Sequence, residues 1–356
     1  MRATVRDVAA RAGVSPKTVS NVLNGTFRVS PATRQKVEEA VAALDYVPNL
    51  SARGLRNGRT GMIAVALPDL RMSYSAEMCH HFVVAAGKRG LHVQIEETAG
   101  GVDREVELMS RARAQLIDGL ILNPVRLETT AVQRAVAMPP VVLIGEVDQP
   151  IVDHVWIDNT AAVREITQLL IDEGHRRIAI VGADNTATAQ VRLIGFHQAL
   201  EAAGISAEAA LEIPSPDWHS TDAARWFGEF LDTHDVPEAV VCMTDTLAMG
   251  VISALHDHGL SVPGDVSVVG YDNITDSATM VPALTTIDFD KQKFAETAID
   301  VLAARIADPN RPIMSVTIPH RIMRRASTRQ RSTRKTGPRK TGTRKTGPRK
   351  PSTRKG

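Results

Sequence analysis

Hydrophobic and polar residues follow two different periods along this chain. In the first sixty residues, apolar side chains recur at spacings of three and four, the period of helices that pack on one side. From Gly61 onward, short apolar runs alternate with amphipathic stretches, as in repeated strand–helix units around parallel sheets. Residues 324–356 contain almost nothing apolar. The pattern therefore predicts a small helical segment, a large α/β body and a disordered tail.

Three helices are expected in the first segment, over about residues 5–11, over 16–24, and from 31 to a point before Pro48. Their expected N-cap residues are Thr4, Ser15 and Ser30. Thr4 is followed three residues later by Asp7, which makes a variant capping box. Each of the two serines precedes a proline, whose missing N–H is harmless at the first helical position. Gly25 ends the second helix.

The first two helices and the GVS turn between them form a helix-turn-helix that the third helix can cover. Apolar side chains of the second helix share one face, and polar side chains share the other. The apolar set is Val19, Val22 and Leu23, and the polar set is Lys17, Thr18 and Asn21. A short helix with such a polar face suits the major groove of DNA.

Three stretches of this segment carry a family resemblance: "TVRDVAARAGVSPKTVSNVLNG", "VSPATRQKVEEAVAALDYVPN" and "ARGLRNGRTG". They resemble the DNA-binding head of the lactose/galactose repressor (LacI/GalR) family. The resemblance implies that residues 1–48 bind DNA, with Pro16, Lys17 and Asn21 at base-reading positions and Thr18 and Ser20 at phosphate or helix-face positions. Lys17 can donate to guanine and Asn21 can pair with adenine. Many family members have Arg at position 21, so the operator sequence is not predicted.

Residues 49–60, "NLSARGLRNGRT", are expected to be a hinge helix that folds on the operator. The resemblance implies that this helix lies in the minor groove, where Leu55 wedges between base steps and Arg53 contacts the DNA. The segment is too short and polar to hold a helix alone. The alternative is a tether with an incidental leucine.

The body, residues 61–323, reads as two similar α/β lobes. Its expected strands are "GMIAVALPD", "LHVQIEE", "GLILNPV", "VVLIGEV", "RRIAIVGAD", "AVVCMTD" and "DVSVVGYDN". The pattern restarts near "DEGHRRIAIVGAD", which predicts lobe 1 over about 61–160 and 291–318 and lobe 2 over about 161–290. The resemblance continues through "RLIGFHQAL", "TDTLAMGV" and "PALTTIDFD". It implies a periplasmic-binding-protein-like fold with an effector site between the lobes.

Ligands of open parallel sheets bind beyond the carboxyl ends of the strands, and the resemblance selects six residues there. They are Tyr74, Glu146, Arg192, Trp218, Thr244 and Asp272. Arg192 and Asp272 would bind ligand hydroxyls, Trp218 would stack on a sugar face, and Thr244 stands where Asn is frequent. Glu146 follows Gly145, where the family often has Asp, and whether it substitutes is open. The aromatic residues could instead be ordinary packing residues, and the charged ones could pair within a lobe.

The distribution of charge along the chain supports this interpretation. The net charge of +2 is the sum of large positive and negative charges in different segments. Residues 1–60 carry +6, residues 61–308 carry −20 and residues 309–356 carry +16. Basic ends on an acidic body suggest that the ends meet a polyanion. We expect the "TRKTGPRK" repeats of the tail, residues 324–356, to add nonspecific phosphate contacts. A merely solubilising or added tail is the alternative.

No segment has the length of a signal peptide or a membrane span, so we expect a cytoplasmic, nucleoid-associated protein. The two cysteines, Cys79 and Cys242, suggest neither a disulfide nor a metal site. No catalytic or cofactor motif is recognised, so we expect no enzyme, no cofactor and no catalytic residue.

The sequence predicts a homodimeric transcriptional regulator, a repressor, that binds a pseudo-palindromic double-stranded operator. A small effector, a sugar or sugar derivative, would control operator affinity. A nucleobase-type corepressor is the alternative ligand. A solute-binding protein would need an export signal and no DNA-binding head, and a sugar-processing enzyme would need paired catalytic carboxylates.

Overall fold

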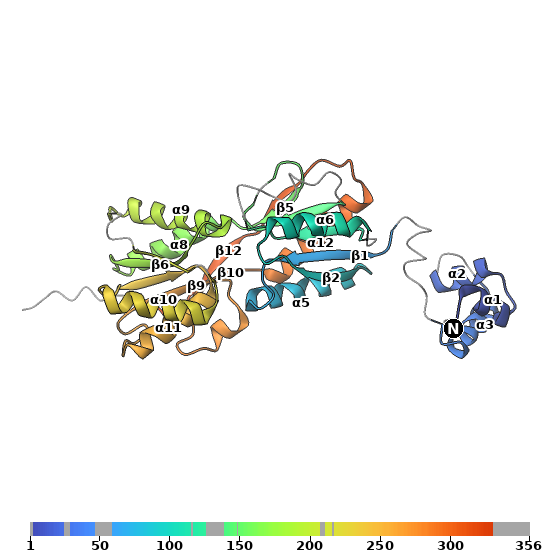
Figure 1. The fold of residues 1–356 in the computed structure, drawn as a ribbon, viewed down its shortest axis with the longest axis horizontal. Coiled ribbons are helices and arrows are strands. Elements are labelled where there is room, and N and C mark those ends of the chain that lie inside the picture. Colours follow the sequence, from blue (N-terminus) through green and yellow to red (C-terminus); the bar gives the residue numbers. More distant parts are fainter. Residues whose placement is uncertain are drawn as a thin grey trace, which may run out of the picture. The chain divides into compact units, whose positions relative to one another are not determined.

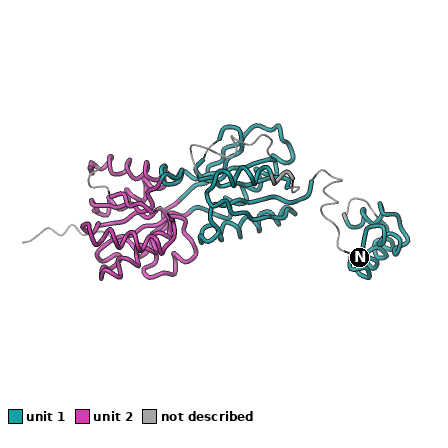
Figure 2. The backbone as a smooth tube through the Cα atoms, viewed as in Figure 1, with its two compact units in different colours: residues 1–159, 185–191, 289–320 teal, residues 160–184, 192–288, 321–356 magenta. Residues whose placement is uncertain are grey.

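The computed structural model describes most of the chain and divides it into two compact units (Figure 2). The described residues are 3–24, 29–46, 59–114, 117–125, 139–147, 149–206, 211–215 and 217–329. Unit 1 comprises Met1–Asn159, Asn185–Val191 and Phe289–His320, and unit 2 comprises Thr160–Asp184, Arg192–Asp288 and Arg321–Gly356. The expected fold class, a helix-turn-helix head and a two-lobed α/β body, is confirmed.

The head consists of α1 (Val5–Ala12), α2 (Pro16–Asn24) and α3 (Pro31–Ala43) (Figure 1). The capping box at its start is present: the Asp7 amide donates to the Thr4 hydroxyl at 3.4 Å, and the Thr4 amide donates to the Asp7 carboxylate at 2.8 Å. Gly13 ends α1 with a φ of 66°, a left-handed conformation that glycine adopts without strain. One apolar cluster joins the three helices: Val8, Ala9, Ala12, Val19, Val22, Val37, Ala40 and Tyr46.

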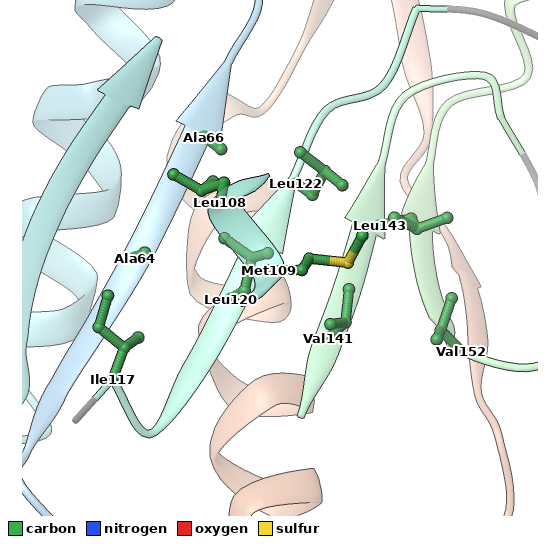
Figure 3. Close-up of a cluster of buried hydrophobic side chains, with 10 residues drawn as sticks. All are labelled: Ala64, Ala66, Leu108, Met109, Ile117, Leu120, Leu122, Val141, Leu143 and Val152. Carbon is green, nitrogen blue, oxygen red and sulfur yellow. The ribbon is translucent and has the colours of Figure 1, made fainter. Parts of the chain in front are cut away.

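Unit 1 contains a parallel sheet in the order β11-β5-β4-β3-β1-β2. Its strands are β1 (Met62–Leu67), β2 (His92–Glu97), β3 (Gly119–Leu122), β4 (Val141–Ile144), β5 (Asp153–Trp156) and β11 (Ser315–Thr317). Its helices are α5 (Ser73–Gly87), α6 (Val102–Ala114) and α12 (Lys291–Ala307). Alternate residues of β1, β3 and β4 pack with Leu108 and Met109 of α6 on one face (Figure 3). Strands β3 and β4 are buried throughout, as expected for a sheet that is covered on both faces.

Unit 2 repeats this design with the sheet order β12-β10-β9-β8-β6-β7. Its strands are β6 (Ile178–Ala183), β7 (Leu211–Pro214), β8 (Ala239–Cys242), β9 (Ser267–Tyr271), β10 (Thr285–Phe289) and β12 (His320–Met323). Its helices are α8 (Asn159–Asp172), α9 (Ala187–Ala202), α10 (Ser220–Thr233) and α11 (Asp245–Asp257). Because β6, β8 and β9 are parallel neighbours, their carboxyl ends lie at one edge of the sheet.

The prediction that the tail begins at residue 324 is wrong for its first six residues. Arg324 forms an ion pair with Glu173, and Ser327 is completely buried. The Ser327 hydroxyl donates to the Val268 carbonyl at 2.6 Å and accepts from the Thr285 amide at 2.8 Å. Composition alone did not reveal these contacts, because serine and arginine are common in disordered segments. The remainder of the expected tail, residues 330–356, and the hinge with Arg53 and Leu55 lie outside the described residues.

Candidate DNA-reading helix and effector site

The start of α2 presents the residues expected to read DNA. Ser15 caps the helix, since its hydroxyl accepts from the Thr18 amide at 3.1 Å and lies 2.9 Å from the Thr18 hydroxyl. Val19 and Val22 are buried in the head, so the opposite face of α2 is turned outward. Pro16 and Lys17 are exposed, and Ser20 and Asn21 are half-buried. Lys17 and Asn21 are one helical turn apart, and both can therefore reach the same stretch of DNA.

The structure also describes where the segment after the hinge joins unit 1. The Asp118 carboxylate, which precedes β3, accepts from the Thr60 amide at 2.8 Å, the Thr60 hydroxyl at 3.0 Å and the Gly61 amide at 2.7 Å. Arg59 donates to the carbonyl of Ile306 at 2.8 Å, in the last turn of α12. These contacts fix the first residues of the body. Asp118 was not predicted from the sequence, because its partners are distant along the chain.

In unit 2, three of the expected effector residues come together at the carboxyl ends of β8 and β9. The Arg192 guanidinium, on α9, donates to the carbonyl of Met243, the residue before Thr244. Its Cζ also lies 3.6 Å from the centroid of the Tyr271 ring, and Tyr271 precedes Asp272. Arg192, Thr244 and Asp272 are each only 5% exposed. Charged groups this deeply buried at strand ends are typical of ligand sites.

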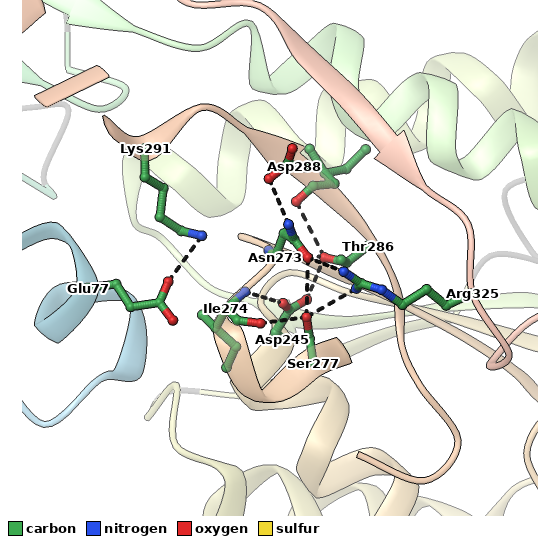
Figure 4. Close-up of polar contacts among 10 residues, drawn as sticks. Glu77, Asp245, Asn273, Ile274, Ser277, Thr286, Asp288, Lys291 and Arg325 are labelled. Atoms are coloured by element: carbon green, nitrogen blue, oxygen red, sulfur yellow. Dashed lines mark hydrogen bonds and ion pairs between the residues drawn. The ribbon is translucent and has the colours of Figure 1, made fainter. Parts of the chain in front are cut away.

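Thr244 also has a place in the local structure as a helix cap. Its hydroxyl accepts from the Leu247 amide at 3.1 Å and caps α11. The next residue, Asp245, is completely buried and accepts from the Ile274 amide at 2.9 Å and from the Thr286 hydroxyl at 2.5 Å (Figure 4). Asp245 thus supports the loop that carries Asp272. It stands in the quoted motif "TDTLAMGV", but its burial could not be read from that motif.

Trp218, the fourth expected effector residue of unit 2, is oriented by a carboxylate. Its indole Nε1 donates to Asp184 Oδ2 at 3.0 Å. Asp184 directly follows β6, as Asp272 directly follows β9. Asp184 was not predicted as a site residue, although the expected strand "RRIAIVGAD" ends on it and its place at a strand end is the signal that could have found it.

Tyr74 and Glu146 belong to unit 1. Tyr74 is the second residue of α5, and its ring centroid lies 6.3 Å from that of Phe289. Glu146 accepts a hydrogen bond from the Asn159 amide group. An Asp at the preceding position would be strained, because Gly145 has a φ of 90°, and its Cβ would displace the Asn123 side chain, whose Oδ1 would lie 2.5 Å away. Glu146 is therefore the acidic residue available at this strand end.

Two further observations concern metal binding and thiol chemistry in the described part of the chain. No group of three or more His, Cys, Asp or Glu residues in it could hold a metal ion. Burial, together with the nearby Asp245 carboxylate, raises the pKa of the Cys242 thiol well above its ordinary value. The thiol therefore stays protonated at neutral pH and is not a nucleophile. Among the same residues, no helix has the length and apolar character needed to cross a membrane.

Comparison with known proteins agrees with both parts of the fold. The family model for bacterial regulatory proteins of the lacI family matches residues 4–49, and that for the periplasmic binding protein-like domain matches residues 167–328. The HTH-type transcriptional repressor PurR of Aliivibrio salmonicida (strain LFI1238) is 33% identical over 317 residues, covering 86% of this chain and 93% of that protein.

Solved structures show the same likeness. The Lac repressor dimer bound to operator and the anti-inducer ONPF has a TM-score of 0.82 and 29% identity, covering 92% of this chain and 100% of that one. The complex of the transcriptional regulator CelR with cellobiose has a TM-score of 0.68 and 29% identity, with the same coverage. Head and body together define a DNA-binding transcriptional regulator. The chain belongs to the lacI family of bacterial regulatory proteins.

Proposed function

We propose that this protein is a homodimeric repressor whose affinity for a pseudo-palindromic operator is controlled by a sugar or sugar derivative. The main observation in support of this effector site is that Arg192, Thr244 and Asp272 lie near one another at the carboxyl ends of β8 and β9. The guanidinium can donate to ligand hydroxyls and the Asp272 carboxylate can accept from them. Trp218, held by Asp184, offers the apolar ring face that stacks on a sugar.

The family comparison supports a polar effector of this class. One similar structure holds cellobiose, and the Lac repressor structure holds the anti-inducer ONPF. Tyr74 and Glu146 are the residues that we propose unit 1 contributes.

Control of DNA binding by the effector follows from thermodynamic linkage: a ligand changes operator affinity only as far as it binds the two states of the protein with different affinities. The protein thus acts by binding, without catalysis or a cofactor, on chromosomal DNA in the cytoplasm.

Calorimetry with a panel of sugars tests the effector site. We expect Asp272→Asn to weaken the binding of the best sugar by about tenfold or more, because the charged acceptor of its hydroxyls is lost. Asp265→Asn is the matched control, since Asp265 is an exposed carboxylate that bonds only locally, to Ser261. Unchanged affinity in Asp272→Asn refutes the site. If a nucleobase binds and none of the sugars does, the effector is a nucleobase and not a sugar.

For the DNA-reading helix, we propose that Pro16, Lys17 and Asn21 face bases, while Thr18 and Ser20 face the backbone. The probe is a duplex selected from a random pool by the wild-type protein. Lys17→Met should weaken specific binding by roughly 1–3 kcal/mol and relax the preference at one base position. Lys36→Met, an exposed lysine on α3, is the control and should leave that preference intact. Unaltered specificity in Lys17→Met contradicts the assignment.

The hinge residues need a separate test. We propose that Leu55 wedges between base steps of the minor groove beside Arg53 and bends the operator. Leu55→Ala should then reduce both specific affinity and the bend angle measured by energy transfer between dyes on the duplex ends, with sugar affinity nearly unchanged. Bending that persists undiminished rules out the wedge, whatever the affinity does.

A further inference from the structure

The loop that carries Asp272 has an unusual backbone. Asp272 has a φ of 100° and Asn273 a φ of 46°, so two consecutive residues that are not glycine adopt the left-handed half of conformational space. Such conformations are disfavoured for residues with a Cβ and persist only where surrounding contacts enforce them. Backbone strain of this kind is common at binding sites. The residues that hold this loop are therefore candidates for setting the geometry of the effector site.

Two groups hold the loop, one on β10 and one at the start of α11. The Asp272 amide donates to the Ile287 carbonyl at 3.0 Å, and the Ile274 amide donates to buried Asp245 at 2.9 Å. Asn273, the residue between the two, donates from its side-chain Nδ2 to Asp288 Oδ1 at 2.8 Å. These contacts fix the loop to β10 and to the start of α11.

The other side of the loop is held by Arg325, from the end of the described chain (Figure 4). Its guanidinium donates to Asn273 Oδ1 at 2.6 Å, to the Leu284 carbonyl at 2.8 Å and to the Ser277 hydroxyl at 3.2 Å. Three acceptors in different directions match the planar fork of arginine and cannot all be reached by a lysine ammonium. One side chain thus ties the effector loop to the two segments that follow it.

Arg325 itself is held by its neighbours in residues 321–329, which we name the C-terminal strap. The Arg325 amide donates to the Thr285 hydroxyl at 2.9 Å, and the Ala326 amide donates to the Ala283 carbonyl at 2.9 Å. Ser327, fully buried, bonds to both β9 and β10 through Val268 and Thr285. The strap therefore presents the Arg325 guanidinium at a defined position.

We propose that Arg325 is a positioning residue of the effector site: it holds Asn273, and through Asn273 the strained backbone that aims the Asp272 carboxylate at the effector. This inference rests on the proposed role of Asp272 in effector binding. It gives the C-terminal strap a function in ligand response, separate from DNA contact and from the folding of the unit as a whole.

Hydrogen exchange tests the positioning step without any effector. In Arg325→Met, the backbone amides of residues 272–274 should exchange about tenfold faster or more. In the wild type the loop must break its hydrogen bonds to the Arg325 guanidinium before it opens, and in the variant these bonds are absent. The matched control is Arg324→Met, which removes an ion pair to Glu173 from the adjacent position but touches no atom of the loop. Arg325→Lys, a milder change, should give an intermediate rate. Equal exchange in all variants overturns the proposal.

Sugar binding tests the functional step. The probe is the sugar that raises the melting temperature of the wild-type protein most, from a panel that includes cellobiose and ribose. Its affinity should fall roughly tenfold in Arg325→Met, less in Arg325→Lys and not in Arg324→Met, the size expected for one charge-assisted hydrogen bond. A purely structural role predicts lower melting temperatures with unchanged affinity in the folded protein, and that result refutes the positioning role.

The two tests separate the inference from the proposed function. Faster loop exchange with full sugar affinity in both Arg325→Met and Asp272→Asn shows that the site lies elsewhere, so the proposed function fails together with the positioning role. Loss of affinity in Asp272→Asn but not in Arg325→Met leaves the site intact and overturns only the inference.

Discussion

Gly195 lies one turn after Arg192 on α9, where the helix packs against the start of α8. A Cβ at this position would overlap the carbonyl oxygen of Thr160 and lie 3.1 Å from the Arg164 amide nitrogen. Both atoms belong to the backbone of α8, so neither can move aside cheaply. The missing side chain thus sets the distance of α9 from α8 and, with it, the depth at which Arg192 enters the strand ends.

Gly195→Ala is expected to destabilise the protein by about 3 kcal/mol, as overpacking against backbone does, and to weaken sugar binding by displacing Arg192. Gly228→Ala is the control: it also lies within a helix, and its nearest neighbour, His258 Cε1, is 3.5 Å away. That variant should be neutral or slightly more stable. Urea unfolding of both measures the difference, and equal stabilities disprove the close packing.

Glu105, on α6, gives the protein a dependence of stability on pH. Burial raises the pKa of this carboxyl to about 7 from an ordinary 4.5. Between these values the folded state binds more protons than the unfolded state, so stability falls as the pH rises from 4.5 through 7. The loss is on the order of 2–3 kcal/mol once the group is fully ionised.

Glu105→Gln removes this dependence, because a neutral amide has no charge to desolvate. Relative to the wild type, the variant should melt higher at pH 8 and equally at pH 4.5. Glu107→Gln serves as the comparison, since Glu107 is an exposed residue of the same helix in an ion pair with Arg104. A pH profile parallel to that of the wild type shows that Glu105 is not the titrating group.

The motifs selected candidate site residues by their likeness to the family and not by their partners, since the Met243 carbonyl that Arg192 contacts is itself 51 residues away. Arg192 and Thr244 were found from local motifs, and the structure brings them together with Asp272. Asp245 and Arg325 were missed because their significance depends on contacts 29 to 52 residues away. A sequence pattern reports periodicity and capping, which are local, but it does not report which distant segments share a hydrogen bond.

The same limit applies to whole elements. All seven expected strands are present; six are mainly apolar runs, and β2 (His92–Glu97) alternates apolar and polar residues. Strands β5, β7, β10, β11 and β12 were not expected, since they are short or carry polar residues. In β10, for example, Thr285 and Thr286 are fully buried, and hydrogen bonds to the C-terminal strap and to Asp245 satisfy their side chains. Burial of such a strand depends on partners that only the fold supplies.

Asp118 holds the first residues of the body after the hinge, through its three bonds to Thr60 and Gly61. Asp118→Ala should lower the free energy of unfolding by about 1–3 kcal/mol, because two backbone amides lose their acceptor. It should also expose the bond after Arg59 to trypsin. Mass spectrometry distinguishes a body that starts at Thr60 from one that starts at Asn57, the product of cleavage after Arg56. An unchanged ratio of the two products shows that the hydrogen bonds of Asp118 do not protect the bond after Arg59.

Over the whole molecule, charge is divided so that DNA attracts the ends of the chain and not its acidic body. Beyond the C-terminal strap, residues 330–356 carry 11 lysines and arginines and no acidic residue. We predict that a truncation after Arg329 makes the negative slope of log K against log salt for nonspecific duplex DNA shallower by roughly 3 or more, because each phosphate contact contributes about −0.9 to that slope.

The truncation point follows from the structure, since cutting before the C-terminal strap would remove buried Ser327 and confuse lost charge with lost stability. A protein ending at Arg329 should melt like the full chain, and one ending at Met323 should melt lower. A full-length variant with glutamine at all 11 basic positions of residues 330–356 separates the effect of the tail's charge from the effect of its length. If charge acts, its slope matches that of the truncation. If all slopes equal that of the wild type, the basic residues make no phosphate contacts and serve another purpose, such as solubility.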